Sequence, residues 1–321
     1  MGTESAIEGG ASGAAGSSSG TIGDGIGTSA WFHGPSDVAL SLSGNVGLVA
    51  DDHACMIRRV DIGTGAVTTL AGAFGICGLA DGVGTSARFN RPASVALVNH
   101  GRVAFVIDQG NHNLRRIDMA SATVTTIVGR GSSGAEDGVG TNARFNSPLG
   151  VAATEDGAII LVADYGNNRV RHVVVATRTV TTIAGSSESS ADGTGANVQF
   201  QGPVGIDVTD DGATAYVSEH MANCVRQIDV ASGAVTMLAG STGIAGYADG
   251  IGSVARFNHP WHVTLSHSGL LVADGGNHRI RSVDPSTGAV TTVAGTGEGG
   301  TDDQDCGRAP QGTPRELLGA P

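Results

Sequence analysis

Asp81-Gly82-Val83-Gly84-Thr85-Ser86-Ala87-Arg88-Phe89-Asn90-Arg91-Pro92 is one of five closely related stretches in this sequence of 321 residues. The other four cover residues 24–35, 137–148, 192–203 and 249–260, so the unit recurs about every 56 residues. Each copy begins with Asp-Gly-x-Gly, carries phenylalanine eight positions after the aspartate, and ends in proline. A repeat of this length indicates an array of similar structural units that stack on one another.

Two further landmarks keep the same register in all five copies. The first is an acidic residue followed seven positions later by arginine: Asp51/Arg58, Asp108/Arg115, Asp164/Arg171, Glu219/Arg226 and Asp274/Arg281. The second is a valine- and threonine-containing run that ends in glycine, at residues 67–72, 124–129, 180–185, 235–240 and 290–295. Because the charged residues recur in every copy, we predict that they are structural: partly buried pairs of one acid and one arginine, with the arginine stem packed between blades.

The second copy indicates four short strands. Residues 94–97, 103–108, 114–118 and 124–129 are apolar or β-branched, and turn-forming residues such as Asn99-His100-Gly101 separate them. Four antiparallel strands per repeat form a propeller blade, which buries its two apolar faces by packing against its neighbours. We therefore predict an all-β fold, a β-propeller of four-stranded antiparallel blades, with five blades identified.

Composition and charge set the domain limits and the partner classes. The net charge is −12, and all 18 basic residues are arginine, which disfavours nucleic acid as a partner. No run is apolar enough for a membrane span, and residues 1–20 lack the pattern of a secretory signal. We expect disordered ends at 1–20 and 296–321 around a propeller at 21–295. The default location is then the cytoplasm, or the extracellular space if the chain is a fragment.

The four cysteines, Cys55, Cys77, Cys224 and Cys306, show neither zinc-ligand nor disulfide spacing. We predict that they are buried or idle thiols.

The segments Ala163-Asp164-Tyr165-Gly166-Asn167-Asn168-Arg169-Val170-Arg171 and Ala273-Asp274-Gly275-Gly276-Asn277-His278-Arg279-Ile280-Arg281 resemble the NHL-repeat family, and the resemblance extends over about 270 residues. It implies a β-propeller, and six blades are common in that family. The two ends of this chain are too poor in strand-forming residues to supply a convincing sixth. The family includes lyases, RNA-binding ubiquitin-ligase components, receptor modules and scaffolds, so the resemblance leaves the function open.

Residues that differ between copies are the candidates for a site. On the face that carries the interblade loops, which we call the top face, the loops between the second and third strands vary and include Tyr165 and His220. Trp31 and Trp261 flank the prolines of the first and last copies. If the ring closes through these two blades, Trp31, His33, Trp261 and His262 would share one binding patch. The tryptophans could equally seal the seam between the blades.

Enzymatic interpretations have less support. Just before the first long strand, near the predicted axis, the copies place Asp37, Ser94, Gly150, Gly205 and His262. A zinc lyase would need three ligands there, and only His262 is suitable; Asp37 and Asp207 are the only inner-strand carboxylates for calcium. We name no catalytic residue, metal ligand or cofactor. The sequence favours a non-enzymatic scaffold that binds a protein through its top face. The alternative is a metal-dependent lyase or hydrolase with an ion in the central channel.

Overall fold

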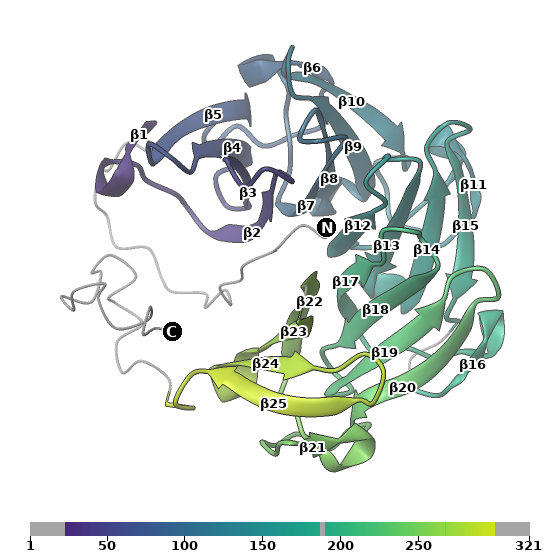
Figure 1. Ribbon diagram of the computed structural model, residues 1–321. Coiled ribbons are helices and arrows are strands. Elements are labelled where there is room, and N and C mark those ends of the chain that lie inside the picture. Colours follow the sequence, from purple (N-terminus) through teal and green to yellow (C-terminus); the bar gives the residue numbers. More distant parts are fainter. Residues whose placement is uncertain (1–22, 187–189, 267, 299–321) are drawn as a thin grey trace.

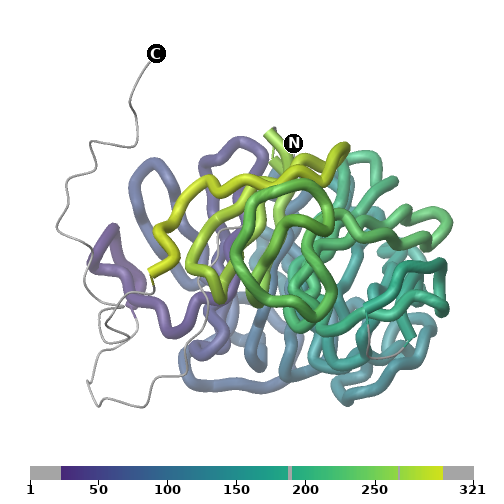
Figure 2. Tube along the Cα trace, turned by 90° about the horizontal axis from the view of Figure 1, so that it is seen from below, coloured from purple at the N-terminus to yellow at the C-terminus, as the bar shows by residue number. Residues whose placement is uncertain are grey.

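The computed structural model describes residues 23–186, 190–266 and 268–298. Five antiparallel sheets stand side by side around a central axis (Figure 1), and no α-helix occurs in the described residues. Figure 2 gives the edge-on view of the same arrangement. The predicted all-β propeller with five blades is confirmed. The predicted disordered ends fall almost wholly outside the described residues.

Each blade has five strands, one more than predicted. Blade 2 has the order β6-β10-β9-β8-β7, with β7 (Pro92–Val98) nearest the axis, then β8 (Val103–Asp108), β9 (Asn113–Asp118), β10 (Thr123–Val128) and the outermost β6 (Gly82–Val83). The extra strand is the Asp-Gly-x-Gly segment itself, which pairs with the fourth long strand of its own blade. The sequence does not predict this strand, because only two residues pair there and a glycine-rich segment of that length shows no strand pattern.

The other blades repeat this arrangement. Blade 1 contains β1 (Gly25–Ile26), β2 (Pro35–Leu40), β3 (Val46–Asp51), β4 (Met56–Asp61) and β5 (Ala66–Gly72); blade 3 contains β11 (Gly138–Val139), β12 (Gly150–Ala153), β13 (Ile159–Asp164), β14 (Arg169–Val174) and β15 (Thr179–Ala184). Blade 4 contains β16 (Gly193–Thr194), β17 (Pro203–Val208), β18 (Thr214–Glu219), β19 (Cys224–Asp229) and β20 (Ala234–Gly240); blade 5 contains β21 (Gly250–Ile251), β22 (Pro260–Ser266), β23 (Gly269–Asp274), β24 (Arg279–Val283) and β25 (Ala289–Ala294).

Eight single-turn 3₁₀ helices complete the described elements. Five follow the outermost strands: η1 (Gly27–Ser29), η2 (Gly84–Ser86), η4 (Gly140–Asn142), η6 (Gly195–Asn197) and η7 (Gly252–Val254). The other three lie between the second and third long strands: η3 (Gln109–Asn111), η5 (Tyr165–Asn167) and η8 (Gly275–Asn277).

A buried arginine joins the sequence landmarks within each blade. In blade 3, Nη1 of Arg171 donates to Oδ2 of Asp164 at 2.7 Å and to the Arg144 carbonyl at 2.9 Å. Its Nη2 donates to Oδ1 of Asp137, the Asp-Gly-x-Gly aspartate, at 2.7 Å. Asp137 also accepts from the Thr182 hydroxyl at 2.9 Å, which ties in the valine–threonine run. Burial raises the pKa of Asp164, although the hydrogen bonds and Arg171 oppose that shift.

The arginines of the other four blades occupy the same position. Three of them lie 2.7 Å from the acid at the end of the second long strand: Arg115 from Asp108, Arg226 from Glu219 and Arg281 from Asp274. In blade 1 the pair is looser, because Nη1 of Arg58 lies 3.6 Å from Oδ2 of Asp51, although it still donates to the carbonyl before the phenylalanine, that of Trp31, at 2.8 Å. Each arginine also reaches the outer aspartate of its blade, in the pairs Arg58–Asp24 at 3.1 Å, Arg115–Asp81 at 2.9 Å, Arg226–Asp192 at 2.6 Å and Arg281–Asp249 at 2.6 Å.

Two details predicted for the acid–arginine pairs are wrong. Both members of each pair are fully buried, not partly, since the side chains of the arginines and of the strand-end acids are all 0 % exposed: Arg58, Arg115, Arg171, Arg226 and Arg281 with their partners. The units are also larger than pairs, because every arginine binds a second carboxylate. The physical reason is the Asp-Gly-x-Gly segment, which forms the outermost strand and so brings its aspartate onto the guanidinium.

Neighbouring blades are joined by the phenylalanine of the repeat. The Arg171 guanidinium lies 5.2 Å from the centre of the Phe145 ring, and that ring packs with Leu114 and Val128 of blade 2. The same arrangement recurs at three other interfaces, where the packed sets are Phe89 with Ile57 and Ala71, Phe200 with Val170 and Ala184, and Phe257 with Val225 and Ala239. Each of blades 2 to 5 is therefore attached to the blade before it by its own Phe-x-x-Pro segment.

The ring does not close through blades 1 and 5. The inner strands pack in the order β2, β7, β12, β17 and β22, and a gap remains between blade 5 and blade 1 (Figure 1). Across the inner end of that gap, Nε2 of His262 lies 3.8 Å from Oδ1 of Asp37.

The prediction of idle thiols is wrong for two cysteines. Cys55 and Cys77 form a disulfide, with their Cα atoms 5.3 Å apart. The spacing in sequence does not reveal this pair, because Cys77 lies in the loop between blades 1 and 2, and the Gly75 N–H of that loop donates to the Ala54 carbonyl in the β3–β4 turn. Among the described cysteines, Cys224 is free and buried, and Cys306 lies outside the described residues.

Replacing Arg171 by alanine should lower the free energy of unfolding by about 3–5 kcal/mol, because it leaves the buried Asp164 carboxylate without its cation. Arg144→Ala is the matched control: the Arg144 side chain is 31 % exposed and lies 3.6 Å from Glu136, and the backbone carbonyl that Arg171 uses remains. This control should change stability by less than about 0.5 kcal/mol. Urea unfolding of the three proteins measures both effects, and equal losses would contradict a special role for the buried arginine.

Candidate functional site

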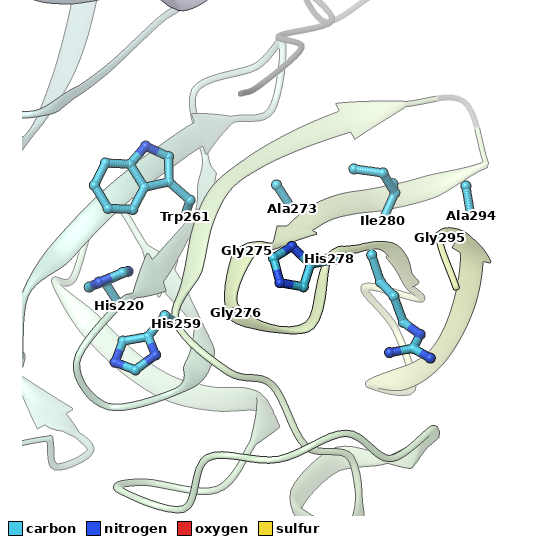
Figure 3. A pocket seen from close by; sticks show the side chains of 11 residues that line it. His220, His259, Trp261, Ala273, Gly275, Gly276, His278, Ile280, Ala294 and Gly295 are labelled. Atoms are coloured by element: carbon cyan, nitrogen blue, oxygen red, sulfur yellow. The ribbon is translucent and has the colours of Figure 1, made fainter. Parts of the chain in front are cut away.

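A pocket of about 430 Å³ opens on the top face at blades 4 and 5 (Figure 3). Its polar rim comes from loops at the ends of strands, and its apolar floor comes from the sheet of blade 5. The lining residues are His220, His259, Trp261, Ala273, Gly275, Gly276, His278, Arg279, Ile280, Ala294 and Gly295.

Two imidazoles and an indole form one side of the pocket. The His220 ring lies 4.8 Å from the His259 ring and 4.9 Å from the Trp261 ring, which it meets edge to face. His259 is held in place because its backbone N–H donates to Oδ1 of Asn223 at 2.8 Å. Burial lowers the pKa of His220, and the nearby His259 lowers it further. Both effects favour the uncharged form of the His220 imidazole.

The opposite side of the pocket is the turn between β23 and β24. His278 ends η8 in a left-handed conformation, with φ of 52°. Arg279 is fixed by its guanidinium, which lies 3.8 Å from the centre of the Tyr247 ring, and its Nη2 donates to the Thr296 carbonyl at 2.7 Å. The floor consists of Ala273, Ile280 and Ala294 from the face of blade 5 that borders the gap. The pocket thus combines an apolar floor with nitrogen-bearing groups at the rim.

The structure brings together two of the six residues predicted for binding. His220 and Trp261 are in contact in the pocket. Tyr165 lies at the top of blade 3, next to Gly202 of blade 4. His33 is near the rings of His53 and Phe74, at 5.7 and 6.0 Å.

The shared patch of Trp31, His33, Trp261 and His262 does not form in this structure. Trp31, 58 % exposed, belongs to blade 1, whereas Trp261 lies against His220 in the pocket. The gap separates these two blades (Figure 1), so the tryptophans do not seal a common seam. His262 faces Asp37 across the gap.

Three pocket residues, His259, His278 and Arg279, were not predicted from the sequence. The Asn277-His278-Arg279 turn was interpreted only as part of the repeat signature. His259 holds a position where the other copies have glycine, arginine or serine, and that difference was a usable signal.

The two inner-strand carboxylates link neighbouring blades. Oδ2 of Asp37 accepts from the Ser94 hydroxyl at 2.7 Å, and Oδ2 of Asp207 accepts from the Leu265 N–H at 2.7 Å. Burial raises the pKa of Asp207 to about 6, against hydrogen bonds and the nearby His262. Within the described ranges, no group of three His, Cys, Asp or Glu side chains is arranged to hold a metal ion. Because of the hydrogen bonds from Ser94 and Leu265, both carboxylates already serve as acceptors for protein groups.

Comparison with known proteins identifies the family. The five sheets around a common axis define a repeat protein of the β-propeller class. The NHL-repeat signature matches residues 145–173. The chain is 30 % identical over 245 residues to Protein SUPPRESSOR OF QUENCHING 1, chloroplastic, of Arabidopsis thaliana, and 28 % identical over 253 residues to human NHL repeat-containing protein 2. The chain belongs to the NHL-repeat β-propellers.

These relatives are much longer than the match. The alignment covers 72 % of this chain but 23 % of the Arabidopsis protein, and 69 % of this chain but 35 % of the human protein. Among solved structures, an auxiliary nutrient binding protein from Bacteroides thetaiotaomicron superposes with a TM-score of 0.60 at 14 % identity, covering 82 % of this chain and 58 % of that one. A chain of a nidogen/laminin complex gives 0.56 at 13 % identity, covering 78 % and 75 %. These likenesses show the fold alone. In the part of the chain that is described, no helix is long and apolar enough to cross a membrane.

Replacing Asp207 by asparagine should remove a pH dependence from folding. In the folded protein this carboxyl has a pKa of about 6, against about 3.9 when unfolded. Between those values the folded state binds more protons, so wild-type stability should fall as pH rises from 4 to 6. Between pH 4 and pH 7 the loss relative to Asp207→Asn should be roughly 2 kcal/mol for a shift of this size. Urea unfolding at pH 4, 5, 6 and 7 tests this; parallel curves for the two proteins would contradict it.

Proposed function

We propose that this propeller is a non-enzymatic binding scaffold whose top-face pocket receives a segment of a protein partner. The observation that carries the proposal is the pocket itself, in which His220 and Trp261 lie to one side of His278 and the apolar Ile280 and Ala294 lie to the other. Sites of this kind, concave and largely apolar with a few oriented polar groups, are typical of ligand recognition.

A peptide segment suits this lining better than a small polar ligand. Trp261 offers a large flat surface with little conformational entropy to lose, and tryptophan is enriched among residues that dominate protein interfaces. The imidazoles and the glycines at 275 and 276 lie on turns held by rigid strands, so polar backbone groups of a bound segment meet fixed partners. Among the described residues, the lining side chains include no hydroxyl, thiol or carboxylate that the imidazoles could activate, which supports binding over catalysis.

The proposal is tested by selecting peptides from a random display library on the purified protein. Affinities of the selected peptides are then measured on Trp261→Ala and on Trp31→Ala, the matched control outside the pocket. The first change should weaken binding at least tenfold, because it removes one wall of the pocket. The second should leave the affinity unchanged. Selected peptides that bind Trp261→Ala as well as wild type, or that depend on Trp31, would contradict the proposed site.

A further inference from the structure

The apolar floor of the pocket corresponds to a surface that the phenylalanine of the next blade covers in blades 1 to 4. We call this surface the phenylalanine seat, or seat, of a blade. In blades 1 to 4 the residues equivalent to Ile280 are buried completely, because the phenylalanine of the next blade covers them: Ile57, Leu114, Val170 and Val225 are each 0 % exposed. In blade 5, Ile280 is 36 % exposed and Ala294 is exposed as well. Val293 on the same strand is 58 % exposed, whereas its counterpart Ile127 in blade 2 is 5 % exposed.

The glycine at the end of each fourth long strand shows how closely the phenylalanine ring of the next blade packs. A Cβ atom built on Gly72 would lie 3.1 Å from the Phe89 ring, and one on Gly185 would lie 2.9 Å from the Phe200 ring. Gly295 is the equivalent residue of blade 5, and it lines the pocket together with Ile280 and Ala294. The place that a phenylalanine ring takes at the other blades is therefore part of the pocket.

The rim supplies the polar half of the same seat. At three interfaces the left-handed residue of the turn between the second and third long strands accepts a hydrogen bond from the N–H that precedes the next proline. Nδ1 of His112 accepts from Ser147 at 3.0 Å, Oδ1 of Asn168 from Gly202 at 3.0 Å, and Oδ1 of Asn223 from His259 at 2.8 Å. His278 is the equivalent in blade 5, and Figure 3 shows its ring at the pocket.

We propose that this pocket is a receptor for an extended segment of another polypeptide that carries phenylalanine and, three residues later, proline. The phenylalanine ring lies on Ile280, Ala294 and Gly295, and the N–H before the proline donates to His278. This inference rests on the proposed function and names the partner's chemistry. The residue before the proline has positive φ at the four seats inside the protein, 55° at Arg91, 46° at Ser147, 67° at Gly202 and 49° at His259. Glycine or asparagine there favours binding, because both adopt this conformation readily.

A second copy of the chain is a poorer occupant than a separate segment. Its own Phe32-to-Pro35 stretch could enter the seat, but blade 2 of that copy packs against the other face of its blade 1. Blade 2 of the second copy would therefore have to enter the gap next to blade 1 of the first copy (Figure 1). A lone segment, or a lone blade, has no such attachment.

The test uses a fluorescein-labelled synthetic peptide with the sequence of residues 139–151, which contains Phe145 and Pro148. Anisotropy titration should show binding to the wild-type protein, and alanine in place of phenylalanine in the peptide should weaken it at least tenfold. Ile280→Arg and His278→Ala in the protein should each weaken it at least tenfold. His278→Asn should restore most of the affinity, since asparagine is the acceptor in blades 3 and 4. Ile62→Arg, an exposed residue after β4 in blade 1, is the control and should have no effect.

Three outcomes would overturn this inference. The first is no binding, or binding indifferent to the phenylalanine or to Ile280. The second is that display-selected peptides require Trp261 yet are not displaced by the Phe-x-x-Pro peptide; the proposed function would then stand while this inference fails. The third is concentration-dependent self-association in sedimentation velocity that Ile280→Arg abolishes, which would assign the seat to a second copy.

Discussion

A buried guanidinium in every blade is the interaction on which the rest of the structure depends. It has fixed donors, and a different landmark of the repeat supplies each partner: the strand-end acid, the outer aspartate and the carbonyl beside the phenylalanine. In blade 3 all of these partners lie within 3.0 Å of Arg171. A charge removed from water is tolerated only when opposite charges pair with it, and here both Nη atoms of the guanidinium bind carboxylates. The landmarks therefore recur in every copy for one shared reason.

This arrangement also determines how blades join. Because the arginine holds the stretch before Phe145 against its own blade, the ring projects toward Leu114 and Val128 of the preceding one. Each blade thus has a phenylalanine on one side and a seat on the other. An open arc of such units necessarily leaves one seat uncovered, and in this protein that seat, with His278 at its rim, is the candidate site.

The sequence was sufficient for the fold and for the pairing of each acid with its arginine, because both depend on patterns repeated in register. It was insufficient where contacts between distant segments decide the outcome. The second carboxylate at Arg115 comes from Asp81 on a short outer strand, which was missed because two residues of Asp-Gly-x-Gly carry no strand pattern. The pairing of Cys55 with Cys77 depends on the path of one loop.

The candidate site was half visible in the sequence. His220 and Trp261 stood out as departures from the repeat, whereas His278 was hidden inside the repeat signature. The contact of His220 with His259 joins residues of blades 4 and 5, so it depends on how those blades pack.

The central claim is that a following phenylalanine segment protects each blade and that the described residues supply none for blade 5. Amide hydrogen exchange followed by mass spectrometry tests it on the free protein, by comparing β24 and β25 with the equivalent β14 and β15 of blade 3. We predict that residues 279–294 exchange substantially faster than residues 169–184, because exposed apolar packing lowers the local free energy of opening. Equal protection of the two segments would mean that the face of blade 5 that borders the gap is covered in solution, and would contradict this claim.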